Sequence, residues 1–150
     1  MRILWIEDIK SYPEKEIFPT EIIENYEICK VGSKFEEIVK AFDAKEIVKY
    51  DFFVIDLDLR KSDIRNSHSA KAFMQKLKIN YTDEELIEKF IKEAGYHLAV
   101  ELICRIGFPL ERVVFVTGYA NEIPGDFEDD LETIKLCIWE KDYERARNTQ

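Results

Sequence analysis

The sequence predicts a doubly wound α/β fold, in which one sheet of five parallel strands carries helices on both of its faces. Short apolar stretches alternate along the chain with stretches whose apolar residues recur at helical spacing, which is the pattern of this fold class. Residues 52–55 are four bulky apolar residues that end on an acid, as is typical of a strand buried on both faces. The length of 150 residues suits one domain and is too short for two.

The first half of the chain contains most of the clear signals. Three apolar stretches are expected to be strands: residues 2–6, 26–31 and 52–55. Residues 34–42 carry apolar side chains at helical spacing and follow Ser33, which can cap a helix at its start. A helix is also expected between residues 8 and 25, but Pro13 and Pro19 fall inside it. Because Pro19 would bend or end a helix, this one is expected to be short or displaced.

After the third strand the chain departs from simple alternation. Residues 60–80 are polar and are expected to form a long loop with at most one helical turn. Thr82 and Glu85 then form a capping box, which predicts an amphipathic helix that is interrupted at Gly95 and stops at Gly107. Two more apolar stretches are expected to be strands: residues 113–116 and 134–139. Because helical segments separate most of the strands, this order predicts a parallel sheet with right-handed crossovers.

Chemically active side chains follow four of the predicted strands: Glu7 with Asp8, Asp56, Thr117 and Lys141. The carboxyl ends of parallel strands meet at one edge of a sheet, which is where α/β proteins bind ligands. Three carboxylates at this edge would repel one another and raise each other's pKa unless a cation lay between them. Oxygen ligands suit Mg²⁺, and a hydroxyl with an ammonium suits the oxygens of a phosphoryl group. The set predicts Mg²⁺-assisted phosphoryl transfer to a carboxylate.

Each of these side chains also has a purely structural explanation. Glu7, Asp8 and Asp56 could cap the turn or helix that follows their strand. Thr117 could be an ordinary strand residue, since threonine favours strands, and Lys141 could be an ordinary exposed lysine. The sequence leaves these explanations open for each residue taken singly, while the five residues taken together favour a shared site.

The five residues and the apolar stretches before them resemble the receiver domain of two-component response regulators. The similarity covers most of the chain, in four segments: residues 3–8, 50–56, 113–118 and 137–141. The resemblance implies a flavodoxin-like sheet with the strand order 2-1-3-4-5. It also implies one receiver-like domain over residues 1–150, with a helical insertion after the third strand at approximately residues 60–94.

The resemblance implies that Asp56 is the phosphoacceptor, which takes its phosphoryl group from a phosphohistidine on a histidine kinase or a phosphotransfer protein. Mg²⁺ would be bound by Asp8 and Asp56 and by the backbone carbonyl of Asp58, with Glu7 acting through water or assisting. Such a domain is a self-catalysed phosphoacceptor, with autophosphatase activity as an option, and is not an enzyme that turns over a substrate.

Further positions carry roles in the resemblance. Lys141 would pair with the phosphoryl oxygens, and the Thr117 hydroxyl would move toward them. The Asp58 side chain and Tyr119 stand where the family tunes the access of water to the phosphoryl group. These positions are therefore expected to act on the same site as Asp56.

The chain departs from the family pattern in ways that keep two other hypotheses open. Residues 60–62 follow the acceptor strand where the family usually has a proline, and Asp142 follows Lys141 where the family has another proline. These departures favour a receiver-like module that signals by protein contact without phosphorylation. A third hypothesis is a phosphatase of the haloacid dehalogenase type, because residues 56–58 resemble its nucleophile motif, although Arg60 and Lys141 do not fit its pattern.

Composition limits the partners of the chain. The formal net charge of -9 at pH 7 disfavours nucleic acid and anionic membranes as direct partners, since both are negatively charged. No apolar run approaches the ~20 residues that span a bilayer, and the start of the chain lacks the pattern of a signal peptide. The 3 cysteines share no CxxC spacing, which fits a reducing compartment. Composition therefore favours a cytoplasmic protein, and the resemblance to receiver domains implies that it contacts a phosphodonor and an unidentified downstream protein.

Overall fold

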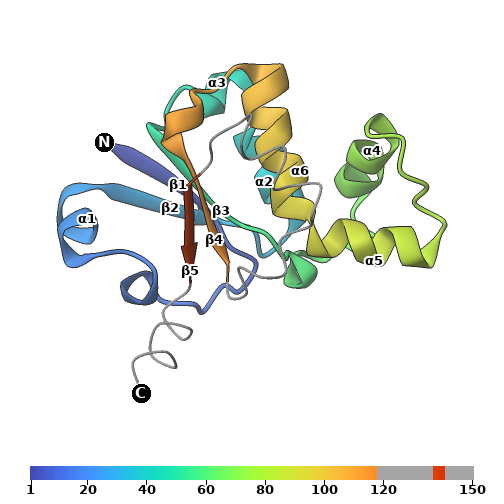
Figure 1. Ribbon diagram of the computed structural model, residues 1–150, viewed down its shortest axis with the longest axis horizontal. Coiled ribbons are helices and arrows are strands. Elements are labelled where there is room, and N and C mark those ends of the chain that lie inside the picture. Colours follow the sequence, from blue (N-terminus) through green and yellow to red (C-terminus); the bar gives the residue numbers. More distant parts are fainter. Residues whose placement is uncertain (118–136, 141–150) are drawn as a thin grey trace.

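Four neighbouring parallel strands form the centre of the computed structural model, which describes residues 1–117 and 137–140 and the side chains of residues 1–116. They are β1 (Arg2–Ile6), β2 (Glu27–Val31), β3 (Phe52–Asp56) and β4 (Val113–Thr117), in the spatial order β2-β1-β3-β4. β5 (Cys137–Glu140) is placed beside β4 and runs parallel to it (Figure 1). The prediction of an α/β fold with a parallel sheet is confirmed.

Helical segments cover both faces of this sheet (Figure 1). One face carries the 3-10 turn η1 (Glu14–Glu16) and α1 (Thr20–Asn25). The other face carries α2 (Phe35–Ala41), α3 (Ala44–Ile47) and α6 (Ala94–Val100), which continues as the π-helix η4 (Glu101–Ile106). The 3-10 turns η2 (Arg60–Ser62) and η3 (Ile64–Asn66) follow β3, and η5 (Leu110–Arg112) precedes β4. Within the described residues, no helix has the length and apolar character needed to cross a membrane.

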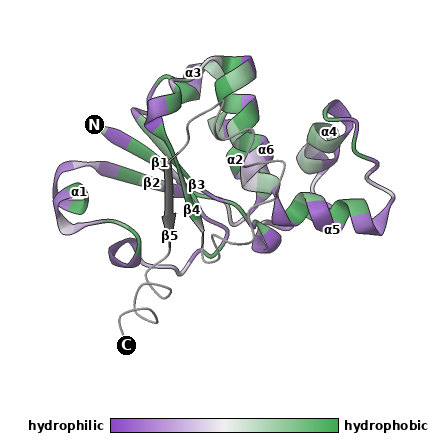
Figure 2. Cartoon of the chain, viewed as in Figure 1, coloured by the Kyte–Doolittle hydropathy of each residue, from purple (hydrophilic) through white to green (hydrophobic). Residues whose placement is uncertain are grey.

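Alternate residues of β1, β2, β3 and β4 enter two separate hydrophobic cores. Leu4, Phe53 and Ile55 belong to the larger core, under α2, α3 and α6, and Trp5 and Val54 belong to the smaller core, under α1. Each of these five side chains is at most 2% exposed. This alternation is expected of strands that are buried on both faces. In Figure 2, α6 is mostly hydrophobic, in keeping with its position against the sheet.

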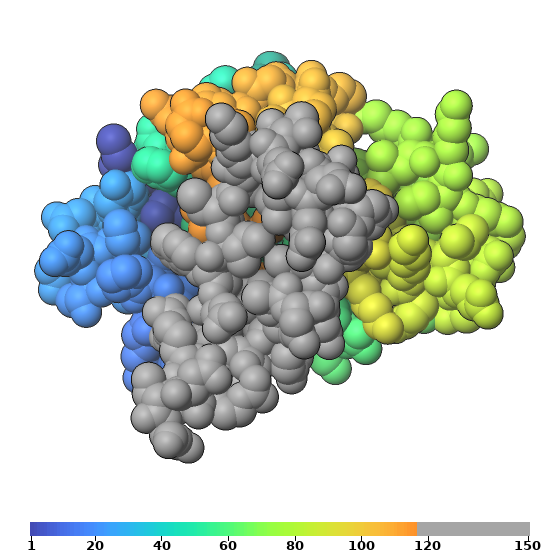
Figure 3. All heavy atoms as spheres, viewed as in Figure 1, coloured from blue at the N-terminus to red at the C-terminus, as the bar shows by residue number. Residues whose placement is uncertain are grey.

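The segment that was expected to be a long loop contains a helix of nine residues, α4 (His68–Lys76). The Ser67 hydroxyl caps its start by accepting a hydrogen bond from the Ala70 amide at 3.0 Å, and the helix buries Ala70 and Met74. The loop prediction is wrong because the polar residues here supply the cap and the exposed face of a helix. α5 (Glu84–Lys92) follows, and the two helices form one edge of the molecule in Figure 3.

Two predictions about helix starts are also wrong. α5 is capped by Asp83, one residue after the expected Thr82, because the Asp83 carboxylate accepts hydrogen bonds from two amides of the first turn. Ser33 does not cap α2; its hydroxyl donates to the Glu37 carboxylate at 2.9 Å. The expectation of a short or displaced helix near Pro19 is confirmed, because α1 has only six residues and begins directly after Pro19, whose missing N–H group leaves no hydrogen bond unmade there.

Gly95 allows α6 to approach the end of β3. A Cβ atom at position 95 would lie 2.0 Å from the carbonyl oxygen of Asp56, much closer than non-bonded atoms come. The Gly95 amide also donates to the Leu57 carbonyl at 3.0 Å. The expected helix interruption at Gly95 is wrong by two residues, because α5 ends at Lys92 and Glu93 separates it from α6. Gly95 is required here by close backbone contact.

We predict that Gly95→Ala lowers the free energy of unfolding by about 3 kcal/mol, because the methyl group forces α6 away from the Asp56 backbone. Gly107→Ala is the control: its Cβ would meet no atom within 4 Å, so only the left-handed φ of 85° opposes it, at a cost of about 1 kcal/mol. Denaturant unfolding measures both losses. Equal losses would contradict the close-contact explanation.

Glu101, the first residue of η4, is a buried carboxylate that lies beside α4. It is 8% exposed and accepts hydrogen bonds from the Lys76 ammonium of α4 and from the Arg105 guanidinium, four residues further along η4. Burial acts to raise the pKa of Glu101, but the hydrogen bonds and charges of these two cations outweigh it and hold the pKa below its ordinary value of 4.5. The ionised form of Glu101 therefore stabilises the folded chain.

We predict that Glu101→Gln lowers the free energy of unfolding by about 1–2 kcal/mol at pH 7, because two charge-assisted hydrogen bonds are weakened. A lowered pKa gives a contribution that is complete above the ordinary value of 4.5 and is lost as the pH falls through the folded-state pKa. Unfolding curves of the two proteins should therefore converge in acid. The exposed Glu24→Gln in α1 is the control, with an expected change within about 0.5 kcal/mol; a difference for Glu101→Gln that persists in acid would contradict the charge-based account.

Candidate metal centre

Two neighbouring strands bring three carboxylates together at the carboxyl edge of the sheet. β1 and β3 pair in parallel with Ile6 opposite Ile55, so the next residues, Glu7 and Asp56, come side by side. Asp8 follows, and one carboxylate oxygen from each acid lies within 4.8 Å of the others. The relative exposures are 0% for Glu7, 6% for Asp8 and 5% for Asp56. The structure thus unites three of the residues that the sequence singles out.

Close backbone contacts hold Glu7 in place. Its amide donates to the Val31 carbonyl at 2.9 Å, which extends the pairing of β1 with β2 by one residue. Gly32 comes next, with a φ of 133°, and a Cβ atom there would lie 2.5 Å from the Glu7 carbonyl oxygen. Because glycine alone adopts this φ readily and has no Cβ, it is the residue that fits beside Glu7.

The turn after β3 folds back to the acids. The Lys61 amide donates to Oδ2 of Asp8 at 2.9 Å, and the buried Ser62 hydroxyl donates to the Gly32 carbonyl at 2.5 Å. η2 therefore joins the end of β3 to the ends of β1 and β2. In the sequence, residues 60–62 stand out only as a departure from a family pattern. The contact of Lys61 with Asp8 is not visible there, because a backbone amide leaves no signal in the residue type.

The chemistry of this donor set fits a hard divalent cation. Three buried carboxylates at short range repel one another, and a cation between them offsets that repulsion. Oxygen-only ligands are those that Mg²⁺ prefers, and Mg²⁺ commonly keeps several waters. Two ligand oxygens on opposite sides of Mg²⁺ are about 4.2 Å apart, so a group with its oxygens within 4.8 Å can hold the ion after a small contraction or with one acid acting through water. The residues fit the predicted cofactor, which stays a prediction.

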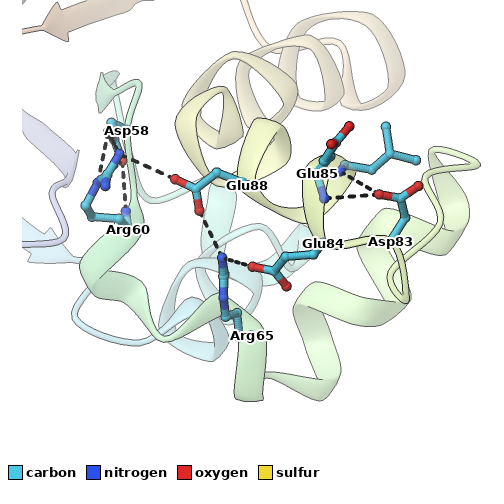
Figure 4. Close-up of polar contacts among 8 residues, drawn as sticks. Asp58, Arg60, Arg65, Asp83, Glu84, Glu85 and Glu88 are labelled. Carbon is cyan, nitrogen blue, oxygen red and sulfur yellow. Dashed lines mark hydrogen bonds and ion pairs between the residues drawn. The ribbon is translucent and has the colours of Figure 1, made fainter.

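The Asp58 side chain turns toward Arg60 and stands outside the group of three acids. Its carboxylate accepts hydrogen bonds from Nη2 of Arg60 at 3.0 Å, from Nε at 3.2 Å and from the Arg60 amide at 3.1 Å (Figure 4). The hydrogen bond that Arg60 donates to Asp58, followed by the Asp58 charge, raises the pKa of Arg60 above its ordinary value. The roles predicted for Asp58, as a metal ligand through its backbone carbonyl and as a tuning side chain, stay predictions.

The remaining predicted site residues lie at or beyond the limit of the described chain. Thr117 is the last residue of β4, whose Val116 pairs with Asp56, so the Thr117 backbone follows Asp56 at the same edge of the sheet. The side chain of Thr117 and the whole of Tyr119 and Lys141 lie outside the described residues. Their predicted roles toward a phosphoryl group therefore stay predictions.

Comparison with known proteins identifies no family and no function for the chain. No protein-family model, no curated protein and no solved structure matches the chain. The function of the acid cluster has to be argued from its geometry and chemistry. The family resemblance stays a prediction at this point.

We predict that Asp56→Asn raises the free energy of unfolding by about 1 kcal/mol in buffer without divalent cations, because it removes one of three neighbouring buried charges. Saturating Mg²⁺ should reverse the order, since an ion that binds only the folded state at 100 times its Kd stabilises it by about 2.7 kcal/mol. Thermal or denaturant unfolding with and without Mg²⁺ measures both effects.

Asp43→Asn is the matched control for this prediction. Asp43 is exposed and caps α3 through a hydrogen bond that asparagine can also accept, so the change should stay within about 0.5 kcal/mol in both buffers. A loss of stability in metal-free Asp56→Asn, or an equal Mg²⁺ response in wild type and Asp56→Asn, would contradict the electrostatic account of the cluster.

Proposed function

We propose that the chain is a response-regulator receiver domain, which accepts a phosphoryl group on Asp56 with Mg²⁺ bound among Glu7, Asp8 and Asp56. The observation that carries this proposal is the convergence of three buried carboxylates at the ends of two adjacent parallel strands. Burying three like charges at short range opposes folding, so packing alone does not account for the arrangement. A metal site that supports phosphorylation would explain why the three carboxylates are buried together.

The topology supports the same proposal. The order β2-β1-β3-β4, with β5 placed beside β4, corresponds to the flavodoxin-like order 2-1-3-4-5. On this proposal residues 1–150 form one receiver-like domain with an insertion at approximately residues 60–94. Asp56 then stands at the end of the central strand, where α/β folds bind their ligands.

The proposed reaction transfers a phosphoryl group from a phosphohistidine to Asp56. A carboxylate oxygen of Asp56 attacks phosphorus, a new O–P bond forms, and the P–N bond breaks with its electron pair going to the imidazole of the donor. Bound Mg²⁺ would supply positive charge for the phosphoryl oxygens. Lys141 and the Thr117 hydroxyl would contact the same oxygens, and Asp58 and Tyr119 would tune later hydrolysis.

The proposed partners follow from this reaction. A histidine kinase or a phosphotransfer protein is the donor, and the phosphorylated domain changes its contact with an unidentified downstream protein. Such a domain acts in the cytoplasm, without direct contact with nucleic acid or membrane. It is phosphorylated once per molecule and does not turn over an external substrate, apart from hydrolysis of its own phosphoryl group.

A contact-only receiver-like module is the second candidate function, and η2 is the observation that favours it. The Lys61 amide already donates to Asp8, and Arg60 holds Asp58, where the family usually has a proline. These contacts could hold the acids in one arrangement without any phosphoryl group. The haloacid dehalogenase hypothesis gains no such support, because the second acid of its motif, Asp58, turns to Arg60 instead of joining Asp56.

We predict that a small-molecule phosphodonor adds one phosphoryl group to the purified protein when Mg²⁺ is present. Intact mass measures the addition, which should disappear without Mg²⁺ and in Asp56→Ala, because both the acceptor and the ion are needed. Asp43→Asn, which changes an exposed acid outside the cluster, should behave as the wild type.

Each result separates the candidate functions. Phosphorylation that survives Asp56→Ala would contradict the assignment of the acceptor. A folded protein that binds Mg²⁺ and takes no phosphoryl group would favour the contact-only module. Repeated turnover of a phosphomonoester would favour the phosphatase, since a receiver is expected to stop after one phosphorylation per molecule.

A further inference from the structure

A chain of alternating charges runs from the end of β3 into the insertion (Figure 4). Its members, in spatial order, are Asp58, Arg60, Glu88, Arg65 and Glu84. The distances between successive charged atoms are 3.0, 3.9, 2.9 and 2.5 Å. The first member lies two residues after Asp56, and the last lies in the first turn of α5. These ion pairs therefore link α5 of the insertion to Asp58, which lies two residues after Asp56 of the acid cluster.

Arg60 is the member of this chain that connects the two parts. Its guanidinium binds the Asp58 carboxylate through both Nε and Nη2 and has Glu88 at 3.9 Å on its other side. The backbone amide of the next residue, Lys61, donates to Oδ2 of Asp8, a member of the acid cluster, at 2.9 Å. Arg60 is thus close enough to the cluster for its positive charge to act there.

The position of Glu88 is fixed by the fold of the insertion. Two residues further along α5, Phe90 packs in the main hydrophobic core and is 1% exposed. The Ile91 carbonyl accepts a hydrogen bond from the Leu59 amide at 3.1 Å, which ties α5 to the residues just before Arg60. Arg65 holds the Glu88 carboxylate at 2.9 Å from the other side. Glu88 is therefore presented to Arg60 by a helix anchored in the core.

We infer that Arg60 is a positioning residue of the phosphorylation site, and that the insertion sets the charge at the mouth of this site through Glu88. This inference rests on the proposed function. Arg60 neutralises Asp58, which would otherwise add a fourth negative charge beside Glu7, Asp8 and Asp56. Glu88 in turn offsets part of the positive charge of Arg60. Nothing in the resemblance to receiver domains assigns a role to either residue.

The inference requires that removing the Arg60 charge and removing the Glu88 charge have opposite effects on the site. Loss of the cation makes the mouth of the site more negative, which favours Mg²⁺ and repels a phosphorylated donor. Loss of the Glu88 charge makes the mouth more positive, which weakens Mg²⁺ binding and favours the donor. If the pair had only a structural role, both substitutions would loosen the insertion. Both would then shift Mg²⁺ binding in one direction and the phosphorylation rate in one direction.

The test compares Arg60→Met and Glu88→Gln with the wild type, using the Kd for Mg²⁺ from calorimetry and the initial rate of phosphorylation by a small-molecule phosphodonor. Arg60→Met should tighten Mg²⁺ binding about threefold and slow phosphorylation about threefold, as expected for one partly screened charge. Glu88→Gln should change both quantities by a similar factor in the opposite direction. Both differences should shrink at high salt.

Glu85→Gln is the matched control, because Glu85 is an exposed glutamate on the same helix and lies outside the charge chain; it should behave as the wild type. Changes of the same sign in Arg60→Met and Glu88→Gln, or no change in either, would overturn the inference while leaving the proposed function intact. A wild type that neither binds Mg²⁺ nor takes a phosphoryl group would overturn the proposed function, and the inference with it.

Discussion

The close approach of three buried carboxylates is the constraint on which the rest of this structure depends. Glu7, Asp8 and Asp56 are each at most 6% exposed and have oxygens within 4.8 Å of one another. Like charges at this range oppose folding, and more strongly in a protein interior than in water. The strands that carry them must therefore be held by other forces. β1 and β3 meet this need, because both are buried on both faces in two hydrophobic cores.

Close backbone contacts position the acids. Gly32 and Gly95 bring neighbouring segments so close to Glu7 and Asp56 that a Cβ atom would lie 2.5 and 2.0 Å from their carbonyl oxygens. The Lys61 amide binds Asp8 directly. Backbone groups have fewer rotatable bonds than side chains, so they fix the spacing of the carboxylates at little cost in side-chain entropy. A site built this way is preorganised for ligand binding.

The parts of the fold that depend on local patterns could be predicted from the sequence. The four strands of the described sheet follow from apolar runs, and the meeting of the three acids follows from their places at strand ends. α4 was missed because its buried residues, Ala70 and Met74, are too few to stand out as a periodic pattern. The short α3 (Ala44–Ile47) was missed because four residues carry little periodicity. The contact of Arg60 with Glu88 depends on where α5 packs, which no local pattern records.

The packing of the insertion decides whether it is a loop on a tolerant surface or a part of the domain. Its Ala70, Met74, Phe90 and Ile91 belong to the same buried core as Phe53 of the central strand. The Phe90 ring lies 6.4 Å from that of Phe35 in α2 and 6.1 Å from that of Phe73 in α4. An added surface loop would leave the core complete without it, whereas this insertion supplies part of the core.

The insertion therefore cannot move freely relative to the acid cluster. α5 buries Phe90 in the core and, half a turn earlier, presents Glu88 to Arg60. If Arg60 sets the charge beside the acid cluster, as we infer, a partner or modification that shifts α5 also moves Glu88 relative to Arg60. The packing of the insertion and this charge are then coupled because one rigid helix carries both the hydrophobic anchor and Glu88.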